Sequence, residues 1–403
     1  MKKSTLLSLD VFAKTEEDVR IRTRTGGFIT LACIVMTMSL LLNEWFHFNK
    51  VVTRPQLVVD RDRHMKLDLF VDISFPHLPC DLVNLDIMDA AGEIQLDLLD
   101  SGWSKTRLDA DGNSLGTQKY EVGKDVSEQL PEDENYCGSC YMARDQSRND
   151  QVDPSERVCC QTCEDVRDAY AEKNWAFFDG KNIEQCEREG YVERLNNHLS
   201  EGCRIGGRAK LNRIEGNLHF APGKAFQNEQ GHFHDTSLYT RTGSLNFNHV
   251  IHKLSFGDDI TQTTDSIPIS TAPLNNREVS PSFDTHFHQF SYFAKIVPTR
   301  FEYLSGTVIE TTQFSATYHD RPLRGGRDED HPNTIHYRGG LPGVFVNFEM
   351  SPLKVINKEQ HAQTWSGFVL NCITSIGGIL AVGTVVDKLA YKAQRSIFGK
   401  KSK

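Results

Sequence analysis

The sequence has none of the short patterns that mark the common enzyme chemistries. It contains no GxxxxGK[ST] phosphate loop, no GxGxxG dinucleotide fingerprint, no HExxH pair and no GxSxG elbow. Acidic residues are plentiful, but none forms a recognisable catalytic pair. Asn-x-Ser/Thr sequons are also missing, so ordinary N-glycosylation is not expected. These absences favour a protein that binds partners, without catalytic activity and without a cofactor.

Long apolar runs are also few. Gly26–Leu42 and Trp365–Val386 carry no charged side chain. As helices they would reach about 26 and about 33 Å, close to the hydrocarbon thickness of a bilayer. No small-residue cleavage site follows the first run, so it is typical of an uncleaved anchor rather than of a signal peptide. The sequence therefore predicts two transmembrane helices, at residues 26–42 and 365–386.

Basic residues flank both predicted spans on the outer side. They are Arg20, Arg22 and Arg24 before the first span, and Lys388, Lys392 and Arg395 after the second. By the positive-inside rule, residues 1–25 and 387–403 are cytosolic tails and residues 43–364 face the lumen. The chain has a formal net charge of −9, although both tails are net basic. The acidic excess thus lies in the luminal part, which argues against nucleic acid or anionic lipid as its ligand.

A dilysine ends the carboxyl tail. Lys400 and Lys401 stand three and four places from the end of the sequence. This spacing behind a span resembles the cytosolic address that the COPI coat reads on ER–Golgi membrane proteins, and such addresses are read by a receptor. The alternative is that the lysines only supply the basic charge that commonly follows a span.

The luminal part is rich in short alternating segments, which predict strands separated by turn residues. Without βαβ alternation, they favour a mainly β fold, an antiparallel β-sandwich. The predicted strands are residues 67–75, 84–88, 93–98, 211–220, 287–297, 301–319 and 344–350, with 84–88 and 93–98 forming a hairpin. Residues 131–203 interrupt the pattern as a small, cysteine-rich helical insert, with helices at 164–173 and 183–196. Residues 321–341 are predicted to form a loop.

Eight of the ten cysteines lie between the spans, namely Cys80, Cys137, Cys140, Cys159, Cys160, Cys163, Cys186 and Cys203. In an oxidising compartment an even set indicates structural disulfides. A redox-active Cys137–Cys140 pair is a second interpretation, because a Cys-x-x-Cys spacing favours thiol exchange. A zinc ribbon is a third, since two Cys-x-x-Cys pairs are suitably spaced. The sequence leaves all three open.

All fifteen histidines follow the first span, and none lies in either predicted tail. His232/His234 and His286/His288 have the i, i+2 spacing that shares one strand face. Histidine titrates near pH 6.5, so these pairs are candidate pH sensors. The His249/His252 spacing would divide across two faces. A metal site on an HxH pair is the less favoured alternative, because no third ligand is evident in the sequence.

Several ordered blocks resemble the ER–Golgi intermediate compartment protein family, also described as ER-derived vesicle proteins. They are residues 8–20 (SLDVFAKTEEDVR), 73–80 (ISFPHLPC), 136–141 (YCGSCY), 159–164 (CCQTCE), 202–206 (GCRIG), 216–223 (GNLHFAPG), 248–257 (NHVIHKLSFG) and 341–345 (LPGVF). The cysteine-rich insert resembles that of the larger-subunit type, which pairs with a smaller relative.

This resemblance implies a non-enzymatic cargo receptor of the ER, intermediate compartment and Golgi membranes. It would form a hetero-oligomer with a smaller related two-span subunit, leave the ER in COPII vesicles and return in COPI vesicles. Its cargo would be escaped ER residents without a tetrapeptide signal, retrieved in a pH-dependent way. Ile397-Phe398 is then the candidate export signal, or else an interfacial anchor.

A luminal thiol–disulfide oxidoreductase using Cys137 and Cys140 is the rival hypothesis. It requires an exposed, low-pKa thiol, whereas a receptor requires a stable surface and cycling signals. The segment around Cys137 has no thioredoxin-like βαβ pattern, which favours the receptor.

Replacing Lys400 and Lys401 with serine is expected to shift the protein from the ER toward the Golgi, because the coat would lose its recognition signal. Quantitative imaging against compartment markers measures the shift. An unchanged distribution in the double variant would refute the retrieval role of this dilysine.

Overall fold

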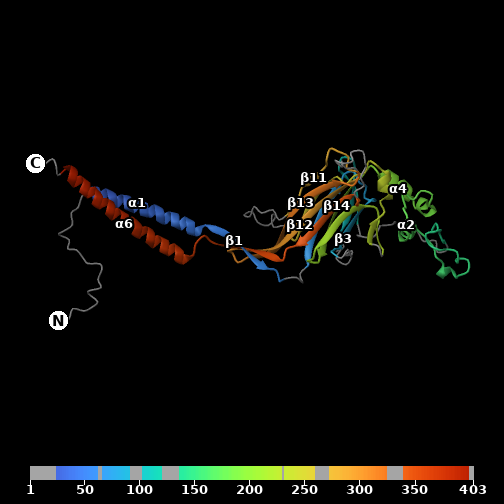
Figure 1. The fold of residues 1–403 in the computed structure, drawn as a ribbon, viewed down its shortest axis with the longest axis horizontal. Coiled ribbons are helices and arrows are strands. Elements are labelled where there is room, and N and C mark those ends of the chain that lie inside the picture. The colour runs from blue at the N-terminus through green and yellow to red at the C-terminus, as the bar shows by residue number, and fades with distance from the viewer. Residues whose placement is uncertain are drawn as a thin grey trace, which may run out of the picture. The chain divides into compact units, whose positions relative to one another are not determined.

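The computed structural model describes residues 24–61, 66–90, 102–119, 136–228, 231–258, 272–324 and 339–398. It divides into two compact units. The first comprises Met1–Arg54, Glu302–Thr307 and Lys358–Lys403, and the second comprises Pro55–Phe301 and Val308–Asn357. Figure 1 shows long helices in the first unit and sheets in the second.

Two helices, α1 (Arg24–Asn49) and α6 (Trp365–Phe398), are long and apolar enough to cross a membrane over Thr25–Asn49 and Trp365–Gln394. The predicted spans lie inside these helices, which continue beyond them at three of the four ends. In Figure 1 the two helices run side by side. A Cβ on Gly383 of α6 would lie 2.8 Å from the Sγ of Cys33 on α1, so the glycine allows their close approach.

Polar and aromatic contacts join one end of this helix pair. The amide Nδ2 of Asn371 donates to Glu44 Oε2 at 3.3 Å, and the amide Nε2 of Gln363 donates to the same oxygen at 3.1 Å. Asn371 is a polar residue within the apolar run of α6, and its amide forms a hydrogen bond between the two helices. Rings of Trp45, Phe48, Trp365 and Phe368 pack beside these groups.

The strands form two large sheets and one small one. The seven-stranded sheet has the order β1 (Val51–Val59), β15 (Leu353–His361), β12 (His288–Glu302), β14 (Gly343–Met350), β7 (Gly216–Pro222) and β3 (Val83–Asp89), with β13 (Val308–Pro322) also on β12. The six-stranded sheet has the order β11 (Arg277–Val279), β10 (His249–Phe256), β2 (Leu67–Phe75), β6 (Gly202–Leu211), β4 (Ser104–Leu108) and β5 (Ser114–Lys119). Strands β8 (Ala225–Asn228) and β9 (Gly231–His234) form a separate two-stranded sheet.

The core lies between the two large sheets. Strand β2 alternates as predicted, with Leu67, Leu69, Val71 and Ile73 buried and the residues between them partly exposed. Aromatic rings pack between the two sheets. The ring centroids of Phe75 on β2 and Phe220 on β7 lie 5.3 Å apart, and those of Phe256 on β10 and Phe348 on β14 lie 5.6 Å apart. Such rings bury a large apolar area, so they supply much of the stabilisation. The predicted mainly β fold is confirmed.

The details of the sheets differ from the prediction in three places. The predicted strand 301–319 begins too early, because β12 runs to Glu302 and β13 begins only at Val308. Strand β12 pairs with β14 in parallel, so the seven-stranded sheet is mixed rather than purely antiparallel. The predicted strand 211–220 is two strands, because β6 ends at Leu211 and β7 begins at Gly216. The predicted strand 93–98 and most of the predicted loop 321–341 lie outside the described residues, although β13 extends to Pro322.

The predicted helix 164–173 of the cysteine-rich insert is α2 (Cys163–Glu172), and a short 3-10 turn, η4 (Pro154–Glu156), precedes it. The predicted helix 183–196 is two helices, α3 (Glu184–Arg188) and α4 (Tyr191–His198), because Gly190 between them adopts a left-handed conformation. Helix α2 begins at a capping box in which Thr162 accepts from the N–H of Asp165, and Asp165 accepts from the N–H of Thr162. A separate small core of disulfide sulfurs, Val166 and Phe177 supports these helices. One further helix, α5 (Ser237–Arg241), follows β9.

Replacing Gly383 with cysteine is expected to allow an oxidant to link position 383 to Cys33, because their side chains would be adjacent. Both thiols would then resist maleimide labelling in the membrane-embedded protein. Gly377 is the matched control, because a Cβ at that position meets nothing within 4 Å. Linkage of Cys33 to position 377 but not to position 383 would contradict the α1–α6 packing.

Candidate functional site

Four ligand-type side chains converge on the outer face of the seven-stranded sheet. Asp86 of β3 and His219 of β7 are direct cross-strand partners. His232 and His234 of β9 cover them from the small hairpin, and one ligand atom from each of the four residues lies within 4.8 Å of the others. We call these four residues the histidine–aspartate cluster.

The contacts within the cluster all involve the Nε2 atoms. The Nε2 of His234 lies 3.2 Å from that of His219 and 3.0 Å from that of His232. Asp86 Oδ2 lies 3.3 Å from Nε2 of His234, 3.6 Å from that of His232 and 3.8 Å from that of His219. Three imidazoles therefore face one carboxylate.

Neighbouring amides orient the cluster. Asn217 donates from Nδ2 to Asn347 Oδ1 at 2.6 Å, and it accepts from Nδ1 of His219 at 2.8 Å. This fixes the tautomer of neutral His219, so its unprotonated Nε2 points toward Asp86. Asn84 donates to Asp86 Oδ2 at 3.1 Å, and the ring of Phe345 stacks on His219 at 5.3 Å.

Burial controls the charge of these groups. It lowers the pKa of His219 to about 3 and that of His234 to about 4. Burial alone would raise the pKa of Asp86, but the hydrogen bond to His232 and the surrounding imidazoles outweigh it and the pKa is lowered. The lowered pKa of His234 disfavours its protonation between pH 7 and pH 6. The pH-sensing role of His232 and His234 remains a prediction.

The sequence pointed to His232 and His234 but not to Asp86 or His219. The third and fourth groups depend on the β3–β7 register, which sequence spacing does not reveal. An open cavity of about 770 Å³ lies beside the cluster, and its walls include Phe233, Phe287, Arg324 and Phe345.

The second predicted pair, His286 and His288, does not share a strand face. His286 precedes β12, donates from Nδ1 to the carbonyl of Leu245 at 2.6 Å, and stacks on Tyr239. His288 is buried on β12 with Nε2 2.9 Å from Asp320 Oδ2 on β13. The two imidazoles therefore have different partners.

All eight cysteines outside the apolar helices form disulfides. The pairs are Cys80–Cys203, Cys137–Cys159, Cys140–Cys160 and Cys163–Cys186. Cys137 and Cys140 thus bond to different partners, which contradicts a redox pair within the Cys-Gly-Ser-Cys motif. The zinc ribbon is excluded as well, because no thiolate remains to bind the metal.

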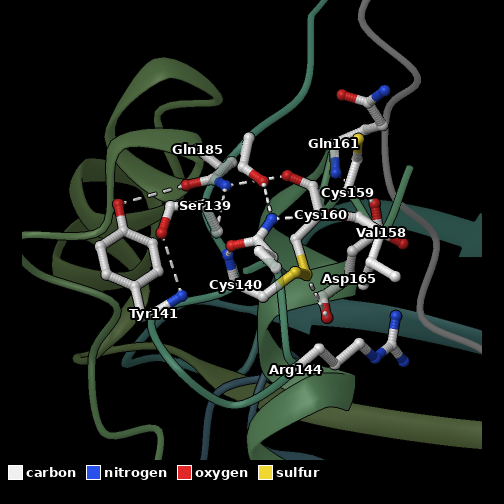
Figure 2. The surroundings of a disulfide bond; sticks show 12 residues. Ser139, Cys140, Tyr141, Arg144, Val158, Cys159, Cys160, Gln161, Asp165 and Gln185 are labelled. Atoms are coloured by element: carbon white, nitrogen blue, oxygen red, sulfur yellow. Dashed lines mark hydrogen bonds between the residues drawn. A yellow bond between two sulfur atoms is a disulfide. The ribbon is translucent and has the colours of Figure 1, made fainter. Parts of the chain in front are cut away.

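The surroundings of the Cys140–Cys160 bond give a structural reason for the motif (Figure 2). The amide Nε2 of buried Gln185 donates to the carbonyls of Ser139 and Cys160, both at 2.8 Å. A Cβ at position 138 would collide with the Cys160 carbonyl, so glycine is required between the cysteines. The disulfide and the Gln185 amide hold two adjacent loop segments together, and no free thiol is exposed there.

The structure describes only the backbone of one of the two predicted sorting signals. Lys400 and Lys401 lie outside the described residues. Ile397 and Phe398 belong to the last turn of α6, but their side chains are outside the described set. Both signals therefore remain predictions.

Comparison with known proteins settles the family. Residues 140–387 match the model of the endoplasmic reticulum vesicle transporter family, and residues 6–96 match that of the Endoplasmic Reticulum-Golgi Intermediate Compartment (ERGIC) family. The chain belongs to the endoplasmic reticulum vesicle transporter family. It is thus a membrane protein of ER–Golgi vesicle transport, as its sequence blocks predicted.

Individual relatives agree with this membership. The chain is 66% identical to the "ER-derived vesicles protein ERV46" of Saccharomyces cerevisiae, with 100% of both chains covered. It is 34% identical to the "Probable endoplasmic reticulum-Golgi intermediate compartment protein 3" of Dictyostelium discoideum, over 98% of this chain and 97% of that one. Among solved structures, "Crystal Structure of Erv41p" covers 75% of this chain and 99% of its own at 17% identity, with a TM-score of 0.38.

A further buried histidine, His249, couples pH to stability. Its Nδ1 donates to the carbonyl of Phe247 at 2.9 Å, and its Nε2 accepts from the hydroxyl of Tyr292 at 2.7 Å. Burial lowers the pKa of His249 to about 4. Below about pH 6.5 the unfolded chain therefore binds a proton that the folded chain does not, and stability falls as pH falls toward 4.

We expect His249 to lower the free energy of unfolding by about 1 kcal/mol between about pH 7.5 and about pH 5.5. Urea unfolding at both pH values measures this loss. In the variant His249→Gln the pH-dependent loss should shrink by about that amount, whereas the control His252→Gln should keep it. An unchanged pH dependence in His249→Gln would contradict the assignment.

Proposed function

We propose that this protein is a cargo receptor that cycles between the ER and the Golgi and retrieves escaped ER residents. The full-length 66% identity to an ER-derived vesicle protein carries the proposal. The two terminal apolar helices support it, because they suit a receptor with a folded domain on one side of the membrane and sorting signals on the other. In this proposal residues 43–364 face the lumen and both tails are cytosolic.

Cycling requires coat signals at the cytosolic side. We assign COPI-dependent return to Lys400 and Lys401, and COPII-dependent export to Ile397 and Phe398. The long α6 helix supports this arrangement, since it continues past the predicted span toward the tail. Receptor-read signals of this kind add no membrane affinity of their own.

The receptor would work as a hetero-oligomer with a smaller related two-span subunit. The apolar outer surfaces of α1 and α6 are compatible with further helix packing, because a Cβ at Gly377 of α6 would meet nothing within 4 Å. ER-resident proteins would bind the β domain, and no nucleic acid would take part.

Binding would depend on pH through His288. Its Nε2 lies 2.9 Å from Oδ2 of Asp320. Asp320 and Arg277 both act electrostatically on the nearby phenol of Tyr318. The rings of Phe283 and Phe290 cover the remaining sides. A proton added to His288 would turn its hydrogen bond with the carboxylate into an ion pair and would remove one net negative charge at this position.

The test is a crosslinked pull-down with the tagged full chain in detergent at about pH 7 and about pH 6, followed by mass spectrometry. We expect luminal ER residents to be recovered about tenfold more at one pH than at the other, which needs only about 1.4 kcal/mol of differential binding. The variant His288→Gln should lose the pH dependence.

The exposed histidine His77 provides the control, because His77→Gln leaves the His288–Asp320 contact intact. Recovery of no ER residents at either pH would refute the receptor function. Equal recovery at both pH values would support a receptor but refute its regulation by pH. If His288→Gln still recovers different amounts at the two pH values, another group is responsible for that regulation.

A further inference from the structure

We propose that the histidine–aspartate cluster is a structural binding site for one divalent transition-metal ion of the zinc class. Asp86, His219, His232 and His234 would each supply one ligand atom. This inference concerns the architecture of the β domain and does not rest on the proposed receptor function.

The spacing of the ligand atoms matches tetrahedral coordination. Four ligands at about 2.0–2.1 Å from a zinc ion stand about 3.3 Å from one another in a tetrahedron. The two Nε2–Nε2 distances given above are 3.0 and 3.2 Å, and the three distances to Asp86 Oδ2 range from 3.3 to 3.8 Å. These five separations lie within about 0.5 Å of the tetrahedral value, and the sixth, between the Nε2 atoms of His219 and His232, is no longer than 4.8 Å.

The hydrogen bonds around the cluster also suit a metal. Because His219 holds its proton on Nδ1 toward Asn217, its Nε2 lone pair points into the cluster. A second amide, Asn84, holds the carboxylate. Outer partners of this kind orient the ligands of metal sites.

One oxygen of the Asp86 carboxylate lacks a partner. Among the described residues, Oδ1 of Asp86 is buried without a hydrogen bond. Only 1% of the Asp86 side chain is exposed. A buried carboxylate that faces neutral imidazoles is costly unless a positive charge compensates it. A divalent cation at the common focus of the Nε2 atoms would provide that charge.

The donor set selects the class of metal. Three imidazole nitrogens and one carboxylate oxygen favour zinc and its neighbours over calcium and magnesium, which prefer oxygen ligands. Because the eight cysteines outside the apolar helices are all in disulfides, no thiolate there competes for the ion. We therefore expect one ion per chain.

Four protein ligands leave no open coordination position, which is typical of a structural rather than a catalytic site. The ion would connect the β8–β9 hairpin to β3 and β7. An isolated two-stranded hairpin is at best marginally stable in water, so this connection would matter. The hairpin also contributes Phe233 to the neighbouring cavity, and the ion would thus fix one wall of that cavity.

The test uses the full chain purified in detergent, stripped with a chelator and titrated with Zn²⁺. We expect one equivalent to bind, and Co²⁺ in its place should give the intense visible absorption of tetrahedral cobalt. The variants His219→Gln and His234→Gln should each bind Zn²⁺ at least about 100-fold more weakly, since even outer partners cost about 10- to 100-fold. His198→Gln is the matched control, because His198 also contacts a carboxylate, Asp81, but lies outside the cluster.

Thermal unfolding keeps the test valid if a variant folds poorly. Zn²⁺ should raise the melting temperature of the stripped wild type, because it binds only the folded site, and should not raise that of Asp86→Asn. Failure of the wild type to bind a stoichiometric ion would overturn the proposal. So would equal Zn²⁺ affinity in wild type, His219→Gln and His234→Gln, which would place the ion elsewhere.

Discussion

Burial of aromatic and aliphatic side chains between the two large sheets is the interaction on which the other features depend. The Phe75–Phe220 and Phe256–Phe348 contacts hold β2 and β10 of one sheet against β7 and β14 of the other. This packing fixes the registers that pair Asp86 with His219 and Asn217 with Asn347. The apolar residues on the inner face of the seven-stranded sheet thus fix the strand register, and that register brings Asp86 and His219 together on its outer face.

The disulfides extend this scaffold into the insert. Cys80 follows β2 and bonds to Cys203 at the start of β6, so this bond lies where the insert rejoins the sheet. The remaining three bonds connect segments of the insert to one another, where the apolar core is small. Small domains with little core commonly depend on such bonds. The cysteines therefore stabilise the fold of the insert.

Local features of the sequence predicted the parts of the fold that depend on local chemistry. The apolar runs at 26–42 and 365–386 lie in α1 and α6, and the alternation of Leu67–Phe75 gave β2 with its correct bounds. Composition predicted helix α2 of the insert, which begins at the capping box of Thr162 and Asp165. These features depend on hydrogen bonds or burial patterns within a few residues.

Features set by contacts between distant residues could not be predicted. The parallel β12–β14 ladder depends on where the chain returns after β13, and no residue in either strand specifies that. Asp86 and His219 meet through register across a long sequence separation, so His232 and His234 appeared to lack further ligands. The shared face expected for His286 and His288 failed because β12 begins only at His288.

The pairing of the cysteines was equally hidden, because several bonding patterns fit the same spacing. Two adjacent residues, Cys159 and Cys160, bond to the two cysteines of the Cys-Gly-Ser-Cys motif in the same order. In a redox motif Cys137 and Cys140 would bond to each other, whereas here each bonds to a cysteine of another segment of the insert.

The most direct test of this structural role is a disulfide map of the full chain, obtained by alkylation without reductant, proteolysis and mass spectrometry. The structure predicts Cys137–Cys159 and Cys140–Cys160 linkages together with Cys80–Cys203 and Cys163–Cys186. A Cys137–Cys140 linkage, or alkylated thiols at these two positions, would contradict the account and restore the oxidoreductase hypothesis.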